Sequence, residues 1–116
     1  MTLYGIRNCD SCRAASKWLS AAGIEFRFHD LRKDGIERAQ VERWLASCDR
    51  ERLLNRRGTT WRQLDESERS RADGDQLADL LLAHPTLIKR PVLEHSTGVE
   101  IGFSAARYEA ILSGAD

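Results

Sequence analysis

The first thirty residues change their hydrophobic period twice, and this constrains the fold more than any other feature. Residues 2–6 are short and β-prone, and they end at the polar break Arg7-Asn8. Over residues 10–22 the apolar side chains recur at helical spacing, at Ala15, Trp18, Leu19 and Ala22. Residues 24–28 alternate strictly between apolar and polar, which predicts a second strand. A strand, a helix and a strand in so short a stretch predict a βαβ unit with parallel strands and a right-handed crossover.

After this unit the sequence predicts a helical middle, from about residue 34 to residue 84. Asp34 is expected to cap its first helix, with Glu37 as the capping-box partner. Cys48 continues the apolar face of that helix, which predicts a buried structural thiol. These short helices cannot bury their faces alone, and no linker divides the chain. We therefore predict one domain over residues 1–116, with residues 34–84 as a helical insertion.

The last thirty residues return to strand-like patterns. Residues 87–93 and 99–103 predict two strands on either side of a turn at residues 96–98. Ser104 is expected to cap a last helix. Pro91 has no backbone N–H, so it belongs at the start of a strand or at a special turn. The order of elements, β-α-β, a helical middle and then β-β-α, predicts an α/β fold.

Charge and hydropathy exclude several classes of function. The chain has 18 basic and 18 acidic side chains, which argues against a protein that binds nucleic acid through bulk charge. The sequence shows neither a leader pattern nor an apolar run of membrane-span length, so we expect a cytoplasmic protein with no direct nucleic-acid or membrane partner. Arg outnumbers Lys by 15 to 3, and codon usage explains that excess. Only individually placed arginines therefore have functional weight.

Cys9 and Cys12 form a C-x-x-C pair at the predicted junction of the first strand and the first helix. Unpaired backbone N–H groups and the helix dipole favour a thiolate on Cys9 there, and Arg7 and Arg13 could add to this effect. Cys12 faces the same side and can attack a mixed disulfide formed on Cys9. One alternative is a zinc site, but a second pair of ligands is missing. The other alternative is that the two small residues at the start of the helix are cysteines by chance and have no function. The position favours redox chemistry with no metal.

Two arginine segments are further candidates. Arg90-Pro91 could form a cis peptide bond that shapes a substrate groove and places Arg90 near the thiolate. A Pro on an edge strand beside a solvated Arg explains these two residues equally well. Arg56-Arg57, before Gly58, could hold a sulfate-like or glutathione-like anion. A solvated run of charge explains that pair more simply.

Four segments of the chain resemble the arsenate-reductase-like ArsC/Spx family. They are residues 3–10 (LYGIRNCD), 27–35 (RFHDLRKDG), 53–61 (LLNRRGTTW) and 87–93 (LIKRPVL). The match covers nearly the whole chain. Within the family, the chain most resembles the small YffB-type bacterial proteins. This resemblance implies a thioredoxin/glutaredoxin-like fold with a helical insertion.

The resemblance also implies roles for particular residues. Cys9 would be the nucleophilic thiol after the first strand. The role of Cys12 as resolving thiol or redox partner is expected from its spacing to Cys9. Arg90, beside a cis Pro91, would contact the anionic substrate or adduct. From their positions in the sequence, we expect secondary contacts to this anion from Arg13 and from Arg56 or Arg57.

In arsenate reductases of this family the thiolate attacks arsenate, glutathione attacks the arsenylated cysteine, and glutaredoxin completes the cycle. The resemblance therefore implies a thiol-dependent reductase with no bound cofactor, and we expect it to be a cytoplasmic monomer. Its substrate would be an oxyanion or a disulfide, glutathione its co-substrate and glutaredoxin a candidate partner.

Two departures from the family pattern disfavour arsenate itself. Asn55 stands where arsenate reductases have an Arg, and Phe103 stands roughly where they have a third anion-binding Arg. Each lost charged hydrogen bond costs about 1.5–3 kcal/mol. The C-x-x-C pair is instead typical of Spx-type regulators. The alternative function is thus an Spx-like redox sensor that binds RNA polymerase through a switch formed by Cys9 and Cys12.

Overall fold

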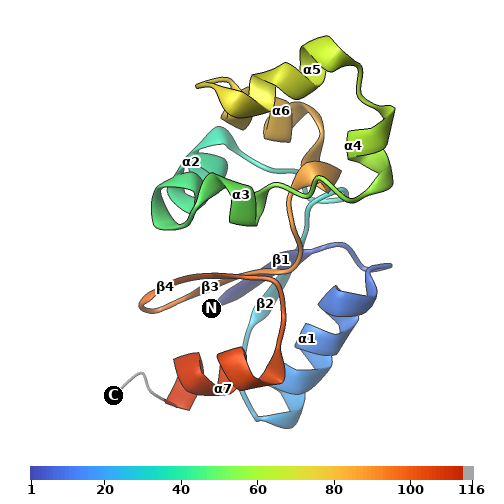
Figure 1. Ribbon diagram of the computed structural model, residues 1–116. Coiled ribbons are helices and arrows are strands. Elements are labelled where there is room, and N and C mark those ends of the chain that lie inside the picture. The colour runs from blue at the N-terminus through green and yellow to red at the C-terminus, as the bar shows by residue number, and fades with distance from the viewer. Residues whose placement is uncertain (114–116) are drawn as a thin grey trace. The chain divides into compact units, whose positions relative to one another are not determined.

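The computed structural model describes residues 1–113, and the chain forms two compact units (Figure 1). The first unit contains residues 1–30 and the chain from Arg90 onward, and the second contains residues 31–89. The predicted insertion of residues 34–84 falls within the second unit, while the assignment of one domain stays a prediction. Among the described residues, no helix combines the length and the apolar character needed to cross a membrane.

A four-stranded sheet with the order β2-β1-β3-β4 forms the centre of the first unit. β1 (Thr2–Gly5) pairs in parallel with β2 (Arg27–Asp30). On its other edge β1 pairs antiparallel with β3 (Val92–His95), which pairs antiparallel with β4 (Gly98–Ile101). The predicted β-α-β and β-β-α orders are confirmed, and with them the thioredoxin-like α/β arrangement.

Two helices of the first unit, α1 (Asp10–Ala21) and α7 (Ala105–Ser113), lie on the same face of this sheet (Figure 1). The fully buried side chains between helices and sheet are Leu3, Ala15, Leu19, Leu93 and Tyr108. The rings of Trp18 and Phe103 meet the Tyr108 ring edge-on, with centroids 5.8 and 4.9 Å away. Such edge-to-face pairs add about 0.5–1.5 kcal/mol each beyond the area they bury.

The register between β1 and β3 determines what lies near the start of α1. Tyr4 pairs with Val92, and the two strands run in opposite directions. The chain that leaves β1 after Tyr4 therefore runs alongside the residues that precede Val92, namely Arg90 and Pro91. The Arg90–Pro91 peptide bond is cis, as the sequence suggested, and the Pro91 carbonyl accepts a hydrogen bond from Gly102 N at 2.8 Å.

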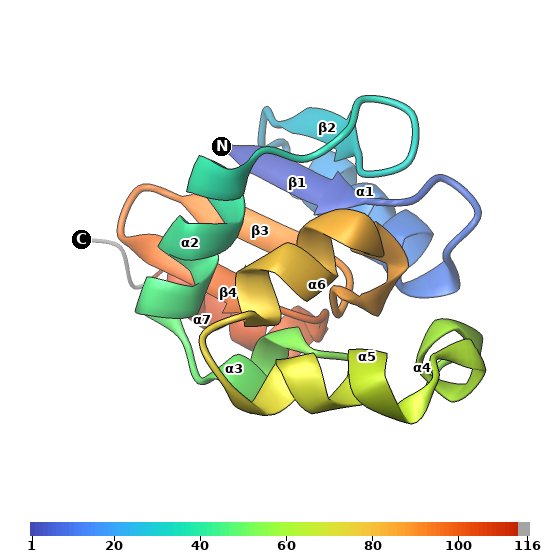
Figure 2. The same cartoon turned by 90° about the horizontal axis from the view of Figure 1, so that it is seen from above.

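The second unit consists of short helices and one isolated bridge between Leu54 and Ile88. Its helices are α2 (Arg38–Ser47), α3 (Arg50–Leu53), α4 (Thr59–Gln63), α5 (Glu66–Ser70) and α6 (Leu77–Ala83), with 3-10 turns η1 (Arg71–Asp73) and η2 (Pro85–Leu87). Helices α2 and α6 pack side by side (Figure 2). They bury Val41 and Trp44 from α2, and Leu77, Leu80 and Leu81 from α6.

The second strand starts later than the alternation of residues 24–28 predicts. It begins at Arg27, whose N–H donates to the carbonyl of Met1 at 3.0 Å. Its partner strand begins only at Thr2, which pairs with Arg27. Residues 24–26 therefore lie beyond the end of β1 and have no partner strand to bond with.

The first helix of the middle region starts at Arg38, and the prediction of Asp34 as its cap is wrong. Its N-cap is Glu37, which forms a capping box with Gln40. Gly35 has a φ of +79°, a backbone conformation that no α-helix contains, so a helix cannot begin before it. Cys48, predicted to be buried, is the C-cap of this helix and is half-buried, with its thiol donating to the Trp44 carbonyl at 3.2 Å.

The predicted strand over residues 87–93 is divided between the two units. Its first part stays with the second unit, where Ile88 bridges to Leu54 and Lys89 N donates to the Leu53 carbonyl at 2.7 Å. β3 begins only at Val92, after the residue that lacks a backbone N–H. The returning strand ends at Ile101, two residues earlier than the alternation predicts.

Replacing Ser104 with Ala is expected to destabilise the first unit by about 1 kcal/mol. The Ser104 side-chain oxygen accepts a hydrogen bond from Arg107 N at 3.1 Å at the start of α7, which confirms the predicted cap. Urea unfolding measures the change in the free energy of unfolding. Ser20→Ala, at an exposed position within α1, is the matched control and should leave stability unchanged or slightly raised. Equal stabilities of the two variants would contradict the capping role.

Candidate functional site

Cys9 lies at the start of α1, as the sequence predicts. The chain turns after β1, with Cys9 N donating to the Ile6 carbonyl at 3.1 Å, and Cys9 then becomes the N-cap with an extended backbone. Its side chain makes no capping hydrogen bond, and its carbonyl accepts from Arg13 N at 3.0 Å. The half-buried sulfur is therefore placed at the N-terminal end of the helix, where unpaired N–H groups favour negative charge.

The surroundings of Cys9 favour its thiolate. Burial by itself raises the pKa of Cys9, but three hydrogen-bond donors outweigh burial and bring the pKa below its ordinary value. These donors are the backbone N–H of Cys12, the thiol of Cys12 and the guanidinium of Arg90. The positive charge of Arg90 acts in the same direction. The structure thus brings together Cys9, Cys12 and Arg90, three of the residues that the sequence singles out, although Arg90 is more than seventy positions from the two cysteines in the chain.

Cys12 has the opposite character. Its side chain is only 1% exposed, and its sulfur accepts a hydrogen bond from Ile6 N at 3.5 Å. Burial, reinforced by the neighbouring Cys9, raises the pKa of Cys12 to about 12. At neutral pH, Cys12 is therefore the thiol that stays protonated and donates to Cys9. The two sulfurs form one coupled pair, in which Cys9 is the better nucleophile.

Gly5 makes room for the Cys12 sulfur. A Cβ atom built on Gly5 would lie 2.4 Å from the sulfur of Cys12 and 3.1 Å from its Cβ. Because Cys12 is buried, its side chain cannot swing into solvent to make space. A residue without a side chain is therefore needed at the end of β1 for the Cys9–Cys12 pair to have this arrangement.

Replacing Gly5 with Ala is expected to lower the free energy of unfolding by about 1–3 kcal/mol, the usual cost of overpacking a core. It should also displace the Cys12 thiol and so raise the pKa of Cys9. Urea unfolding and the pH dependence of Cys9 alkylation measure the two effects. Gly74→Ala is the matched control, since nothing lies within 4 Å of a Cβ built there. A stable Gly5→Ala protein with unchanged alkylation would show that the contact is unimportant.

Arg13, predicted as a secondary anion contact, points its charge elsewhere. Its guanidinium forms an ion pair with Asp10 and donates to the Arg7 carbonyl at 3.5 Å. Arg13 is not among the groups that lower the pKa of Cys9. Its role in binding an anion stays a prediction.

Arg56 and Arg57 belong to the second unit. The Arg56 guanidinium forms a two-pronged hydrogen bond with the Glu51 carboxylate, at 2.8 Å on each side, and lies over the Trp61 ring at 4.8 Å from its centroid. Arg57 is exposed, and its backbone N–H donates to the side-chain oxygen of Asn55 at 3.0 Å. An anion would have to displace Glu51 to take both donors of Arg56, whereas Arg57 is accessible.

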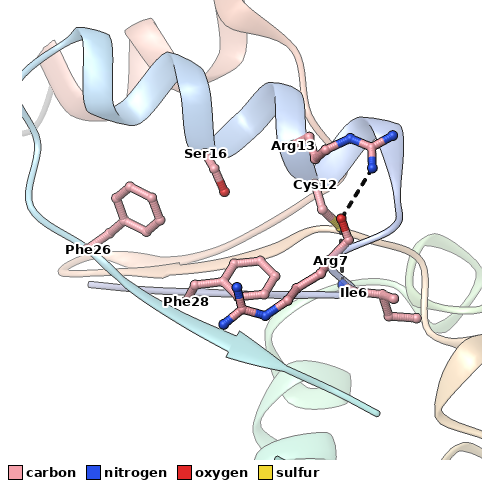
Figure 3. A pocket seen from close by; sticks show the side chains of 7 residues that line it. All are labelled: Ile6, Arg7, Cys12, Arg13, Ser16, Phe26 and Phe28. Carbon is pink, nitrogen blue, oxygen red and sulfur yellow. Dashed lines mark hydrogen bonds between the residues drawn. The ribbon is translucent and has the colours of Figure 1, made fainter. Parts of the chain in front are cut away.

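A pocket beside α1 was not predicted from the sequence. It has a volume of about 520 Å³ (Figure 3). Its lining residues are Ile6, Arg7, Cys12, Arg13, Ser16, Phe26 and Phe28. The alternation of residues 24–28 was the available signal, because it places Phe26 and Phe28 on the same side of the chain. In residues 1–113, no three His, Cys, Asp or Glu side chains gather in a way that could hold a metal ion.

Known proteins are similar to this chain over nearly its whole length. The solved structure of the protein YffB (PA3664) is 41% identical, covers 94% of this chain and 96% of its own, and superposes with a TM-score of 0.86. The solution structure of an arsenate reductase (ArsC) related protein from Brucella melitensis is 44% identical, covers 96% and 92%, and has a TM-score of 0.73.

A regulator is among the more distant relatives. The global transcriptional regulator Spx of Streptococcus pyogenes serotype M3 is 27% identical over 115 residues, which cover 97% of this chain and 85% of that protein. The sequence pattern of the ArsC family matches residues 4–111. The chain therefore belongs to the ArsC family.

Proposed function

We propose that this protein is a thiol-dependent reductase in which Cys9 is the nucleophile and glutathione the co-substrate. The observation that carries the proposal is that Cys12 and Arg90 donate hydrogen bonds to the Cys9 sulfur at the start of α1. A thiol with a lowered pKa is more often ionised at neutral pH, and the thiolate is the reactive form. Membership of a family that includes arsenate reductases supports the same class of chemistry.

The proposed reaction is an exchange of disulfides. The Cys9 thiolate attacks a glutathione mixed disulfide, so that a bond forms between Cys9 and glutathione and the substrate leaves as a thiol. A second glutathione thiolate attacks this adduct, releases the Cys9 thiolate and forms glutathione disulfide. In the net reaction the mixed disulfide and one reduced glutathione become the substrate thiol and glutathione disulfide, and the Cys9 thiolate is regenerated. Cys12 can resolve the adduct instead, but its thiol must first lose a proton, and its high pKa disfavours that route.

Disulfides fit the site better than arsenate does. Phe103 packs edge-on against Tyr108 and brings no cation. Asn55, which stands where arsenate reductases have an Arg, is uncharged, and its side-chain oxygen accepts a hydrogen bond from the Arg57 N–H in the second unit. Arg90 remains as the cation beside the nucleophile. One guanidinium suffices to stabilise a thiolate and an anionic substrate, while tight binding of a multiply charged oxyanion uses several.

The proposal is tested by coupling glutathione oxidation to glutathione reductase and following the consumption of NADPH. A glutathionylated peptide and arsenate are compared as substrates of the reduced protein. We expect turnover of the peptide disulfide and little or none of arsenate. If neither substrate is turned over above the rate of glutathione alone, the reductase proposal is wrong. If arsenate is the better substrate, the choice of substrate class is wrong.

An Spx-like regulator is the second candidate. The observations in its favour are the hydrogen bond between the Cys9 and Cys12 sulfurs, which a disulfide could replace, and the similarity to the Spx regulator. The immobilised protein, reduced or oxidised, would be incubated with purified RNA polymerase. Three results together would favour the regulator over the enzyme. The retention of polymerase would depend on the oxidation state, the Cys12→Ser protein would not show it, and the protein would have no glutathione-dependent turnover.

A further inference from the structure

We propose that the pocket beside α1 is a binding site for a small aromatic carboxylate. This site lies on the Cys12 side of the redox pair, and Cys9 is not part of its lining. The proposal does not depend on the reductase function. It follows from the shape of the pocket, from the aromatic rings in its wall and from the sign of the charge at its edge.

The wall of the pocket is apolar and aromatic. Phe28 belongs to β2 and Phe26 comes just before it, and in Figure 3 the two rings face the pocket, opposite the α1 side chains. Ile6, from the turn after β1, adds a third apolar side chain. Both side chains are half-buried, so part of each is still in contact with water. A volume of about 520 Å³ lies within the range of small-molecule sites, and a flat aromatic body would cover these rings.

The charge in the lining of the pocket is positive. Arg7 and Arg13 are its charged lining residues, and none of the lining residues is acidic. Arg13 is already held by Asp10. The Arg7 guanidinium lies over the Phe28 ring, 5.6 Å from its centroid. No carboxylate among residues 1–113 forms a salt bridge with it.

An occupant must therefore combine two features. Its apolar part would contact the rings of Phe26 and Phe28, while its negative group would meet the guanidinium of Arg7. A carboxylate matches the fork of a guanidinium in shape and charge. Ser16, one turn along α1 from Cys12, adds a hydroxyl to the lining and can donate to the same carboxylate. The occupant would lie against Cys12, which is one of the lining residues.

The test uses 2-naphthoate as the probe, titrated into the reduced full-length protein and followed by ¹H–¹⁵N NMR. We expect saturable shifts centred on Ile6, Ser16, Phe26 and Phe28. Arg7→Met should weaken binding about tenfold or more, since it removes a charged hydrogen bond. The neutral analogue 2-naphthamide should bind the wild type more weakly than 2-naphthoate does. The two probes should bind the Arg7→Met protein with about equal affinity.

Two further variants make the result decisive. Arg27→Met removes the same charge from an exposed position between the two phenylalanines, outside the pocket lining, and should bind like the wild type. Ser16→Phe fills the pocket and should abolish the shifts, with circular dichroism to show that it folds. The proposal is overturned if the wild type shows no saturable shifts at these residues. Equal affinities of the Arg7→Met and Arg27→Met proteins would also overturn it, whether or not Ser16→Phe folds.

Discussion

Replacing Cys9 with Ser is expected to lower the glutathione-dependent reduction of disulfides by about a thousandfold or more, the scale on which enzymes lose activity with their nucleophile. A Ser hydroxyl is not ionised at neutral pH, so the donors from Cys12 and Arg90 have no anion to stabilise. The coupled NADPH assay with a glutathionylated peptide measures this loss. The same substitution at Cys48, a half-buried thiol in the second unit, is the matched control and should leave the rate unchanged.

Replacing Cys12 with Ser should have a much smaller effect than replacing Cys9. A Ser hydroxyl at position 12 can still donate a hydrogen bond to the Cys9 thiolate, and the backbone N–H of residue 12 is retained. The Cys9–glutathione adduct can then be resolved by glutathione alone. Mass spectrometry should find this adduct on Cys9 in the Cys12→Ser protein. If both variants lose activity to the same extent, the two thiols act as an obligatory pair and the glutathione route is wrong.

The pH dependence of alkylation separates the two thiols in the wild-type protein. The pKa of Cys9 is lowered and the pKa of Cys12 is raised to about 12, so the thiolate of Cys9 forms first as the pH rises. Iodoacetamide should therefore modify Cys9 at a pH where Cys12 and an unperturbed cysteine remain largely protonated. Peptide mapping after short exposures identifies the modified residue. Modification of Cys12 before Cys9 would contradict the assignment of the nucleophile.

The position of Cys9 could be predicted because it depends on local pattern alone. A β-prone stretch gives way to helical spacing within a few residues, and the residue at that change of period is the N-cap. The cap at Ser104 could be predicted in the same way. Boundaries that depend on a partner strand could not. β2 begins where β1 supplies hydrogen bonds to it, and the alternation of residues 24–28 contains no information about where β1 starts.

The contact between Arg90 and Cys9 illustrates what local pattern cannot show. It follows from the antiparallel pairing of β1 with β3 and from a register in which Tyr4 lies opposite Val92. Residue types alone predict a solvated Arg90 equally well. The same applies to Arg13, which is close to Cys9 in the chain but is drawn to Asp10. Sequence distance favours Arg13 as the partner of the thiolate, and the sheet register favours Arg90.

This difference leads to a prediction for Arg90. Replacing Arg90 with Met removes a hydrogen-bond donor and a positive charge from the Cys9 sulfur, so the pKa of Cys9 should rise. The alkylation rate of Cys9 at pH 6 should fall by roughly fivefold or more, the lower range for a charged hydrogen bond at a half-exposed site. At a pH well above the new pKa, the rates of the variant and the wild type should converge, because both thiols are then ionised.

Arg13→Met is the matched control for this experiment. It removes the same charge from the first turn of α1, but its guanidinium is held by Asp10 rather than by Cys9. We expect its alkylation profile to stay close to that of the wild type. A larger effect of Arg13→Met than of Arg90→Met would mean that the helix start, and not the arginine before β3, supplies the field around the thiolate. Arg90→Lys distinguishes charge from geometry, since it keeps the charge but loses the planar fork of donors.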